Sequence, residues 1–158
     1  MASDTNLLSE QEIDERVAIL HKLKDYLREQ RNKFYRYLDV LEHEEQDILD
    51  GNVEKLQFHA SMEKDLAGEI ISFQKVINPL HDMYKLNAGE TDLEIPRLQE
   101  SLDLIKEEAA QRSKRNLELL QTRMEDIREE IKTIRKSRKP KSIYDDYVNR
   151  PSMIDIST

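Results

Sequence analysis

The fold is decided by residues 47–56, DILDGNVEKL, where a turn signal separates two long helical patterns. Gly51 suits the left-handed conformation that ends many helices, because it has no Cβ. Asn52 can cap the following helix with its side-chain oxygen. A turn this short places the two flanking helices side by side and antiparallel. We therefore predict a long helical hairpin that turns at Gly51.

The helix before the turn is predicted over residues 10–50. Ser9 and Glu12 form a capping-box pair that marks its start. From Ile13 to Ile48, alternating steps of four and three residues give one mostly apolar face. The polar positions on this face are Lys24, Arg31 and Glu45. We expect them at its edge, with their charged ends in water; the alternative is that they fix the helix register from buried positions.

The helix after the turn is predicted over residues 53–84, with a kink at Pro79, which lacks a backbone donor and clashes with the preceding turn. Its buried face is predicted to contain Leu56, His59, Glu63, Leu66, Ile70, Phe73, Ile77, Leu80 and Tyr84. Gly68 lies inside this helix and costs about 1 kcal/mol relative to alanine. A close approach of a second helix would explain it.

A third helix is predicted over residues 96–136, after a loop at 86–94, with Pro96 in its first turn. Its face contains Leu98, Leu102, Ile105, Ala109, Ser113, Leu117, Leu120, Met124, Ile127, Ile131 and Ile134. The predicted fold is therefore all-α: an antiparallel, coiled-coil-like bundle over residues 9–135, made of the hairpin and a third long helix. Residues 1–8 are expected to be a flexible lead, and 136–158 a basic linker followed by a flexible docking tail.

The third helix is predicted to be longer than its neighbour. A second helix that ended near Pro79 would be roughly 39 Å long, whereas a third helix of about 40 residues would extend well beyond it. Met124, Ile127, Ile131 and Ile134 would then be exposed, and an exposed apolar face marks a binding or self-association site. The alternatives are a homodimer seam and cover by the first helix of the same chain.

Composition and charge exclude several classes of protein. The chain has no cysteine, and its net charge of −8 is distributed unevenly. A basic segment, interpreted as a docking patch for an acidic partner or a solvated helix end, contains Lys132, Arg135, Lys136, Arg138, Lys139 and Lys141. The acidic remainder disfavours nucleic acid as a partner. Without a signal peptide or a stretch long enough to span a membrane, the chain is expected in the cytoplasm.

No pattern in the chain indicates catalysis. Its histidines, at positions 21, 43, 59 and 81, lack the spacing of helical metal sites. The three glycines are isolated, so they form no phosphate-binding loop. We therefore expect no enzyme activity, no metal site and no cofactor.

The hairpin carries a recognisable set of residues: Tyr37-Leu38 with Leu41, Glu44 or Glu45, Leu49, Gly51-Asn52, Leu56, Glu63-Lys64, Leu66 and Ile70. This set resembles the hairpin of FlgN-type flagellar export chaperones. A longer series resembles the spirochaete branch of that family: residues 17–20 (VAIL), 75–80 (KVINPL) and 152–156 (SMIDI). The resemblance covers most of the chain, although the proline-containing tail is not general to the family.

The resemblance implies a cytoplasmic chaperone of type III protein export that takes part in flagellum biogenesis. Its partners would be hook-associated proteins of the hook–filament junction, kept from assembling too early, and components of the export gate. Family members bind their clients through the C-terminal helix region. The predicted client-binding residues are Leu120, Met124, Ile127, Ile131, Ile134, Ile143, Tyr144 and Tyr147. The alternatives are a structural protein that self-associates, with a weak homodimer as its mildest form, and an adaptor that binds an acidic partner through residues 132–141.

Overall fold

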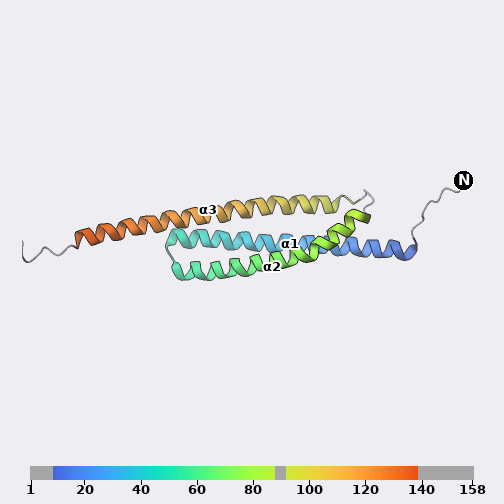
Figure 1. Cartoon of the computed structure of the whole chain (residues 1–158), viewed down its shortest axis with the longest axis horizontal. Helices are drawn as coiled ribbons and strands as arrows, with labels where there is room; N and C mark the ends of the chain where they lie inside the picture. Colours follow the sequence, from blue (N-terminus) through green and yellow to red (C-terminus); the bar gives the residue numbers. More distant parts are fainter. Residues whose placement is uncertain (1–8, 88–91, 139–158) are drawn as a thin grey trace, which may run out of the picture. The chain divides into compact units, whose positions relative to one another are not determined.

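The computed structural model describes residues 9–87 and 92–138, which form three helices (Figure 1). They are α1 (Glu10–Asp50), α2 (Val53–Asn87) and α3 (Glu94–Ser137). The predicted all-α fold is confirmed. The chain divides into two compact units, residues 1–120 and 121–158, so that α3 begins in the first unit and ends in the second. The predicted lead at 1–8 and all of the tail from residue 139 lie outside the described residues.

The turn at Gly51 is built as the sequence predicts. Ser9 begins α1 with a capping box: its Oγ accepts a hydrogen bond from the Glu12 backbone N–H at 3.2 Å, and its own N–H donates to the Glu12 carboxylate at 2.8 Å. Gly51 ends α1 in the left-handed conformation with φ 68°. Asn52 then caps α2, because its Oδ1 accepts from the Lys55 N–H at 3.0 Å.

The helices α2 and α3 are a few residues longer than predicted. α2 continues through Pro79 to Asn87, three residues past the predicted end, and its last turns change direction in Figure 1. α3 begins at Glu94 because the Asp92 side chain accepts a hydrogen bond from the Glu94 N–H at 2.9 Å. Pro96 lies in the first turn of α3, as predicted. A backbone N–H in this turn has no acceptor within the helix, so the missing N–H of proline removes no helical hydrogen bond. α3 ends at Ser137, one residue past the prediction.

The buried face of α1 differs from the predicted face by one residue at every second position. The buried or half-buried series is Leu23, Leu27, Gln30, Phe34, Tyr37, Leu41, Glu44 and Ile48. The central series of the predicted face shares four of these positions and has Lys24, Arg31, Leu38 and Glu45 in place of Leu23, Gln30, Tyr37 and Glu44, although Leu23 and Tyr37 are also predicted to widen the same face. Both series alternate steps of three and four, so periodicity alone cannot separate them. Glu45 is exposed, as the edge interpretation requires, whereas Lys24 and Arg31 are half-buried: the Lys24 ammonium is held in ion pairs and the Arg31 Nε is buried.

The core of the first unit is formed by all three helices. Leu23, Leu27 and Phe34 of α1 pack with Ile77 of α2, and with five residues of α3: Ile95, Leu98, Leu102, Ile105 and Ala109. The α2 face is the predicted one, since each of its nine residues is buried or half-buried. Leu80 and Tyr84, which follow Pro79, also pack against this core. The bend at Pro79 therefore leaves the apolar face of α2 continuous.

Polar contacts fix the register of the helices in the first unit. Gln30, which is completely buried, donates from Nε2 to the Ile70 carbonyl at 3.0 Å, and this joins α1 to α2. Asn116 donates from Nδ2 to the Leu41 carbonyl at 2.8 Å, which joins α3 to α1. Because a buried amide without a partner is costly, a shift of one residue in either pairing is disfavoured.

Ion pairs hold the start of α3 against α1. The Lys24 ammonium lies 2.6 Å from the Asp92 carboxylate and 3.1 Å from that of Glu94, and Arg28 also contacts Glu94. The hydrogen bond from Lys24 lowers the pKa of Asp92, and the same contact raises the pKa of Lys24. The edge position of Lys24 therefore fixes the position of the third helix.

Gly68 is not explained by a close helix approach, which was the sequence-based expectation. A Cβ placed on Gly68 meets no atom within 4 Å, and one placed on Gly51 also meets none. The two glycines differ in backbone conformation only, because Gly51 has a positive φ and Gly68 is helical. Space is therefore no obstacle to alanine at either position.

We expect Gly68→Ala to raise the free energy of unfolding by about 1 kcal/mol, since alanine is the better helix former. Gly51→Ala is the matched control. It should lower the same quantity by about 1 kcal/mol, because alanine resists the left-handed conformation. Urea denaturation of both variants measures the difference. If Gly68→Ala instead lowers the free energy of unfolding, Gly68 is packed against another part of the chain, which would contradict the open space around it.

Candidate functional site

An exposed apolar face lies on the part of α3 that belongs to the second unit. Every residue from Gln121 to Arg138 is exposed. Met124, Ile127, Ile131 and Ile134, here called the α3 stripe, are 46%, 44%, 42% and 49% exposed. Their spacing of three, four and three residues places them along one side of the helix. Single exposed apolar residues are common on protein surfaces, but four in a row on one helix face are not explained by composition alone.

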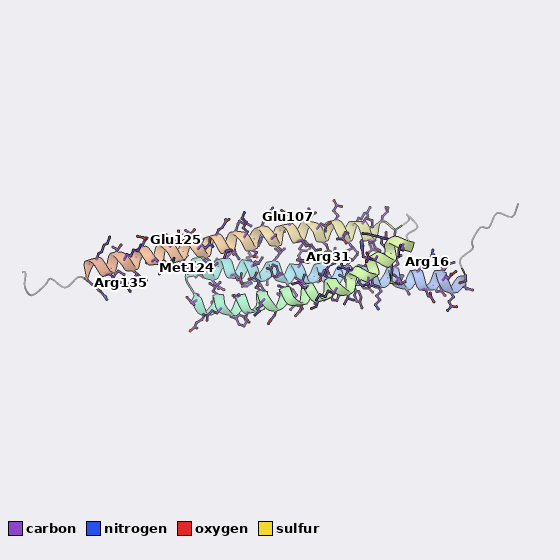
Figure 2. The ribbon with its side chains drawn as sticks, viewed as in Figure 1. Arg16, Arg31, Glu107, Met124, Glu125 and Arg135 are labelled. Atoms are coloured by element: carbon purple, nitrogen blue, oxygen red, sulfur yellow. The ribbon has the colours of Figure 1, made fainter. Side chains whose placement is uncertain are left out.

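Charged residues lie beside the α3 stripe, and Figure 2 labels one of them, Arg135, together with Met124 of the stripe. Arg128 and Arg135 lie four residues after Met124 and Ile131 respectively, which places them along one edge of the stripe. Glu130 lies three residues after Ile127, which places it along the opposite edge. Arg123 lies seven residues before Glu130 and therefore on the same edge, so the partner must match an apolar centre, one basic edge and one edge of mixed charge.

The other predicted client-binding residues are divided by the structure. Leu120 is half-buried and lines a cavity of the first unit, four residues before the first exposed residue of the α3 stripe. Ile143, Tyr144 and Tyr147 lie outside the described residues. Of the predicted basic patch, Lys132, Arg135, Lys136 and Arg138 are exposed, and Lys132 pairs with Glu129 at 2.9 Å. Lys139 and Lys141 also lie outside the described part of the chain.

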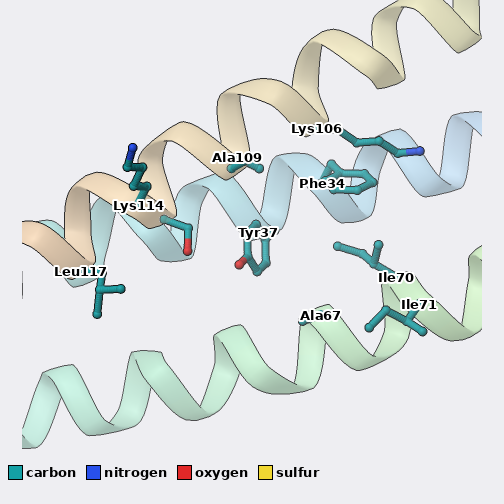
Figure 3. Close-up of a pocket in the computed structure, with 11 residues that line it drawn as sticks. Phe34, Tyr37, Ala67, Ile70, Ile71, Lys106, Ala109, Lys114 and Leu117 are labelled. Carbon is teal, nitrogen blue, oxygen red and sulfur yellow. The ribbon is translucent and has the colours of Figure 1, made fainter.

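The first unit contains a groove that sequence reasoning did not find. A cavity of about 500 Å³ lies between α2 and α3, with Phe34 and Tyr37 of α1 as its floor (Figure 3). Its walls are Ala67, Ile70 and Ile71 of α2, and Lys106, Ala109, Ala110, Ser113, Lys114 and Leu117 of α3. A second cavity of about 360 Å³ shares Ser113 and Leu117 with the first. It extends along α1 to Glu44 and Ile48 and along α2 to Glu63 and Leu56. Together the two cavities form what is called here the α2–α3 groove.

A polar cluster lies within this groove. Tyr37 donates a hydrogen bond from its hydroxyl to the Glu63 carboxylate at 2.7 Å. Glu44 is only 5% exposed, and its Oε1 has no hydrogen-bond partner. Burial and, after it, the neighbouring Glu63 carboxyl raise the pKa of Glu44 to about 8, and the Asn116 amide opposes the shift. Burial and the bond to Glu63 also raise the pKa of the Tyr37 hydroxyl. Glu44 therefore stays protonated far above the range usual for a carboxyl group.

The sequence contained half of the signal for this cluster. Glu63 stands on the predicted face of α2, so a buried carboxyl was already implied there. Glu44 was missed because the predicted face of α1 was shifted by one residue and contained Glu45 instead. The correct series, with Gln30 and Glu44 among apolar residues, would have indicated buried polar positions on α1.

Two further properties of the described residues limit what the site can be. Asp47 accepts a hydrogen bond from His59 across the hairpin, but no group of three or more His, Asp or Glu side chains suited to a metal ion occurs within residues 9–87 and 92–138. In the same part of the chain, no helix combines the length and the apolar character that crossing a lipid bilayer requires.

A relative of this chain occurs in Treponema pallidum (strain Nichols), where it is described as an uncharacterized protein. The two sequences are 30% identical over 150 residues, which make up 95% of this chain and 96% of the other. The match therefore includes both the hairpin and the whole of α3. No family model matches the chain. No solved structure matches it either.

We expect the stability of the chain to fall between about pH 5 and pH 9 because of Glu44. The folded chain holds the Glu44 proton up to about pH 8, whereas the unfolded chain loses it near the ordinary value of 4.5. In this range the folded state binds more protons, so the free energy of unfolding decreases as the pH rises.

Glu44→Gln should therefore have the same free energy of unfolding as the wild type at pH 5 and a higher one at pH 9. The difference at pH 9 should be about 1–3 kcal/mol, a limited value because water in the open groove partly solvates the carboxylate. Urea titrations at pH 5, 7 and 9 measure this, with Glu45→Gln as the exposed neighbouring control. Parallel pH profiles for Glu44→Gln and the wild type would contradict the assignment.

Proposed function

This chain belongs to the family of the Treponema pallidum protein, and on that premise we propose that it is a cytoplasmic chaperone of flagellar type III export. It binds an amphipathic helix of a hook-associated protein, keeps that protein from assembling at the wrong place, and delivers it to the export gate. The role is one of binding, without catalysis. The observation that carries the proposal is the α3 stripe.

The α3 stripe has the geometry of a helix-binding surface. Its four residues follow one side of α3, each more than two-fifths exposed. A partner helix can cover such a face with residues at matching three- and four-residue spacing. Burial of apolar area then drives binding, at about 25 cal/mol for each Å² removed from water. The basic edge favours a partner with acidic residues along Arg128 and Arg135.

Reversible binding is a physical requirement of export. A client segment that is disordered when free and helical when bound loses conformational entropy on binding, so its affinity is lower than its contact area suggests. This property allows release at the gate. The resemblance to FlgN-type chaperones supports the same assignment, because members of that family bind their clients through the C-terminal helix region.

A second copy of the chain is the competing occupant of the α3 stripe. Steps of three and four also suit a coiled-coil pair, which would make the chain a self-associating structural protein. The two alternatives differ in oligomeric state. A chaperone should be a monomer, or a weak dimer that dissociates when a client is added, whereas a structural protein should form a tight dimer at micromolar concentration in sedimentation.

We expect Ile127→Asp and Ile131→Asp each to weaken binding of a purified hook-associated protein by tenfold or more, or about 1.4 kcal/mol, because each places a charge in an apolar contact. Both residues are exposed, so helix content should stay unchanged. Isothermal titration calorimetry measures the affinity.

Leu104→Asp is the matched control, since Leu104 is 67% exposed on the same helix but belongs to the first unit. It should leave the affinity unchanged. Equal affinities for the wild type and both stripe variants, with the fold intact, would remove the α3 stripe from the proposal.

A further inference from the structure

The α2–α3 groove leaves the first unit one helix short of a four-helix bundle. Three helices surround the groove: α1 forms its floor, and α2 and α3 form its walls. From Phe34 to Ile48 the floor spans 15 residues of α1, and the 14 steps between them make roughly 21 Å, which is about four turns of a helix. Four-helix bundles close such a space with one more helix at the same angle.

The walls of the groove suit the side chains of an incoming helix. Small residues recur on both walls, at Ala60 and Ala67 of α2 and at Ala109, Ala110 and Ser113 of α3. The spacing of seven between Ala60 and Ala67 is one heptad, so the small residues repeat at the interval of knobs-into-holes packing. Ile71 and Leu117, which also line the groove, are 60% and 57% exposed. The groove is therefore open to water along apolar side chains.

The floor of the groove carries a charge preference. Glu44 and Glu63 both line the second cavity, and the residues described around that cavity include no Lys, Arg or His. The Glu44 side chain is 95% buried within the unit, yet its Oε1 accepts no hydrogen bond. A buried carboxyl oxygen without a donor costs free energy that a donor from outside can recover. A cationic donor recovers more than a neutral one, because two carboxyl groups stand together.

We propose that the α2–α3 groove binds an amphipathic helix of another protein that has one lysine or arginine in the middle of its apolar face. The apolar residues of this helix pack between the alanine-containing walls, and the single cation pairs with Glu44 and Glu63. All the residues of the groove belong to the first unit, whereas the α3 stripe belongs to the second, and Leu120 at the end of the groove lies four residues before Met124. The pair of carboxyl groups gives the groove a specificity that apolar contact alone does not supply.

A selection from a helix library tests the proposal. The library displays 18-residue amphipathic helices with apolar residues at three- and four-residue spacing and one randomised position in the centre of the apolar face. Selection at pH 7.5 on the full-length chain should enrich lysine and arginine at that position at least tenfold. The double variant Glu44→Gln/Glu63→Gln should abolish the enrichment while apolar binders remain. Recovery of no binders, or of binders without basic enrichment, would overturn the proposal.

Groove-blocking variants locate the selected peptide. Ala110→Trp fills the groove from an exposed position and should weaken binding of the best peptide at least tenfold, as measured by fluorescence anisotropy. Leu104→Trp is the control on the same helix, outside the groove, and should change nothing. If Ala110→Trp reduces helix content, Leu117→Asp provides a second block at a residue that is already exposed.

The outcome separates this proposal from the proposed function. Ile127→Asp should leave peptide affinity unchanged; if it abolishes binding and Ala110→Trp does not, the peptide lies on the α3 stripe and the groove proposal fails alone. Sedimentation of the chain without peptide is the last arm. A dimer that Ala110→Trp dissociates would make the groove an interface between two copies, which also overturns the proposal.

Discussion

The structure depends on one constraint: α3 is a single helix whose apolar face continues well beyond the part of it that is buried. Leu98, Leu102 and Ile105 are buried in the core of the first unit, whereas Met124 and Ile134, on the same face of the same helix, are almost half exposed. A helix of 44 residues is itself continuous because nothing in its sequence interrupts it after Pro96. The exposed residues therefore stay at helical spacing as far as Ile134.

Register in the first unit is set by polar groups rather than by the apolar residues alone. Apolar faces with steps of three and four can pair in more than one way, as the two alternative faces of α1 show. Gln30 and Asn116 select one pairing each, because each amide reaches a single backbone carbonyl of a neighbouring helix. Glu44 lies in the same series without such a partner for Oε1. A buried carboxyl oxygen that accepts no hydrogen bond inside the unit is the reason to look for a donor outside it.

The sequence was sufficient to predict the three helices, but it did not determine which side of α1 is buried. Gly51, Asn52 and the Ser9–Glu12 pair predicted both ends of α1 and the start of α2, because capping is local chemistry that two or three residues determine. The face of α2 was also correct, since each of its nine predicted residues is buried or half-buried. α1 allowed two series, and the choice depends on which helices pack against it. That information lies in α2 and α3, not in α1, so Glu44 and the groove could not be predicted. The end of α2 at Asn87 depends on the bend after Pro79, and the start of α3 at Glu94 depends on the hydrogen bond that Asp92 accepts. Local helix propensity does not predict either one.

The central claim is that the α3 stripe holds a secreted flagellar protein, and cross-linking in the native cell tests it most directly. A photoreactive amino acid at position 127 lies within the stripe, and the same group at position 104 reports an exposed site on the same helix in the first unit. The account predicts that position 127 cross-links to a hook-associated protein, identified by mass spectrometry, and that position 104 does not. Cross-links from position 127 only to a second copy of the chain, or equal cross-linking from both positions, would contradict it.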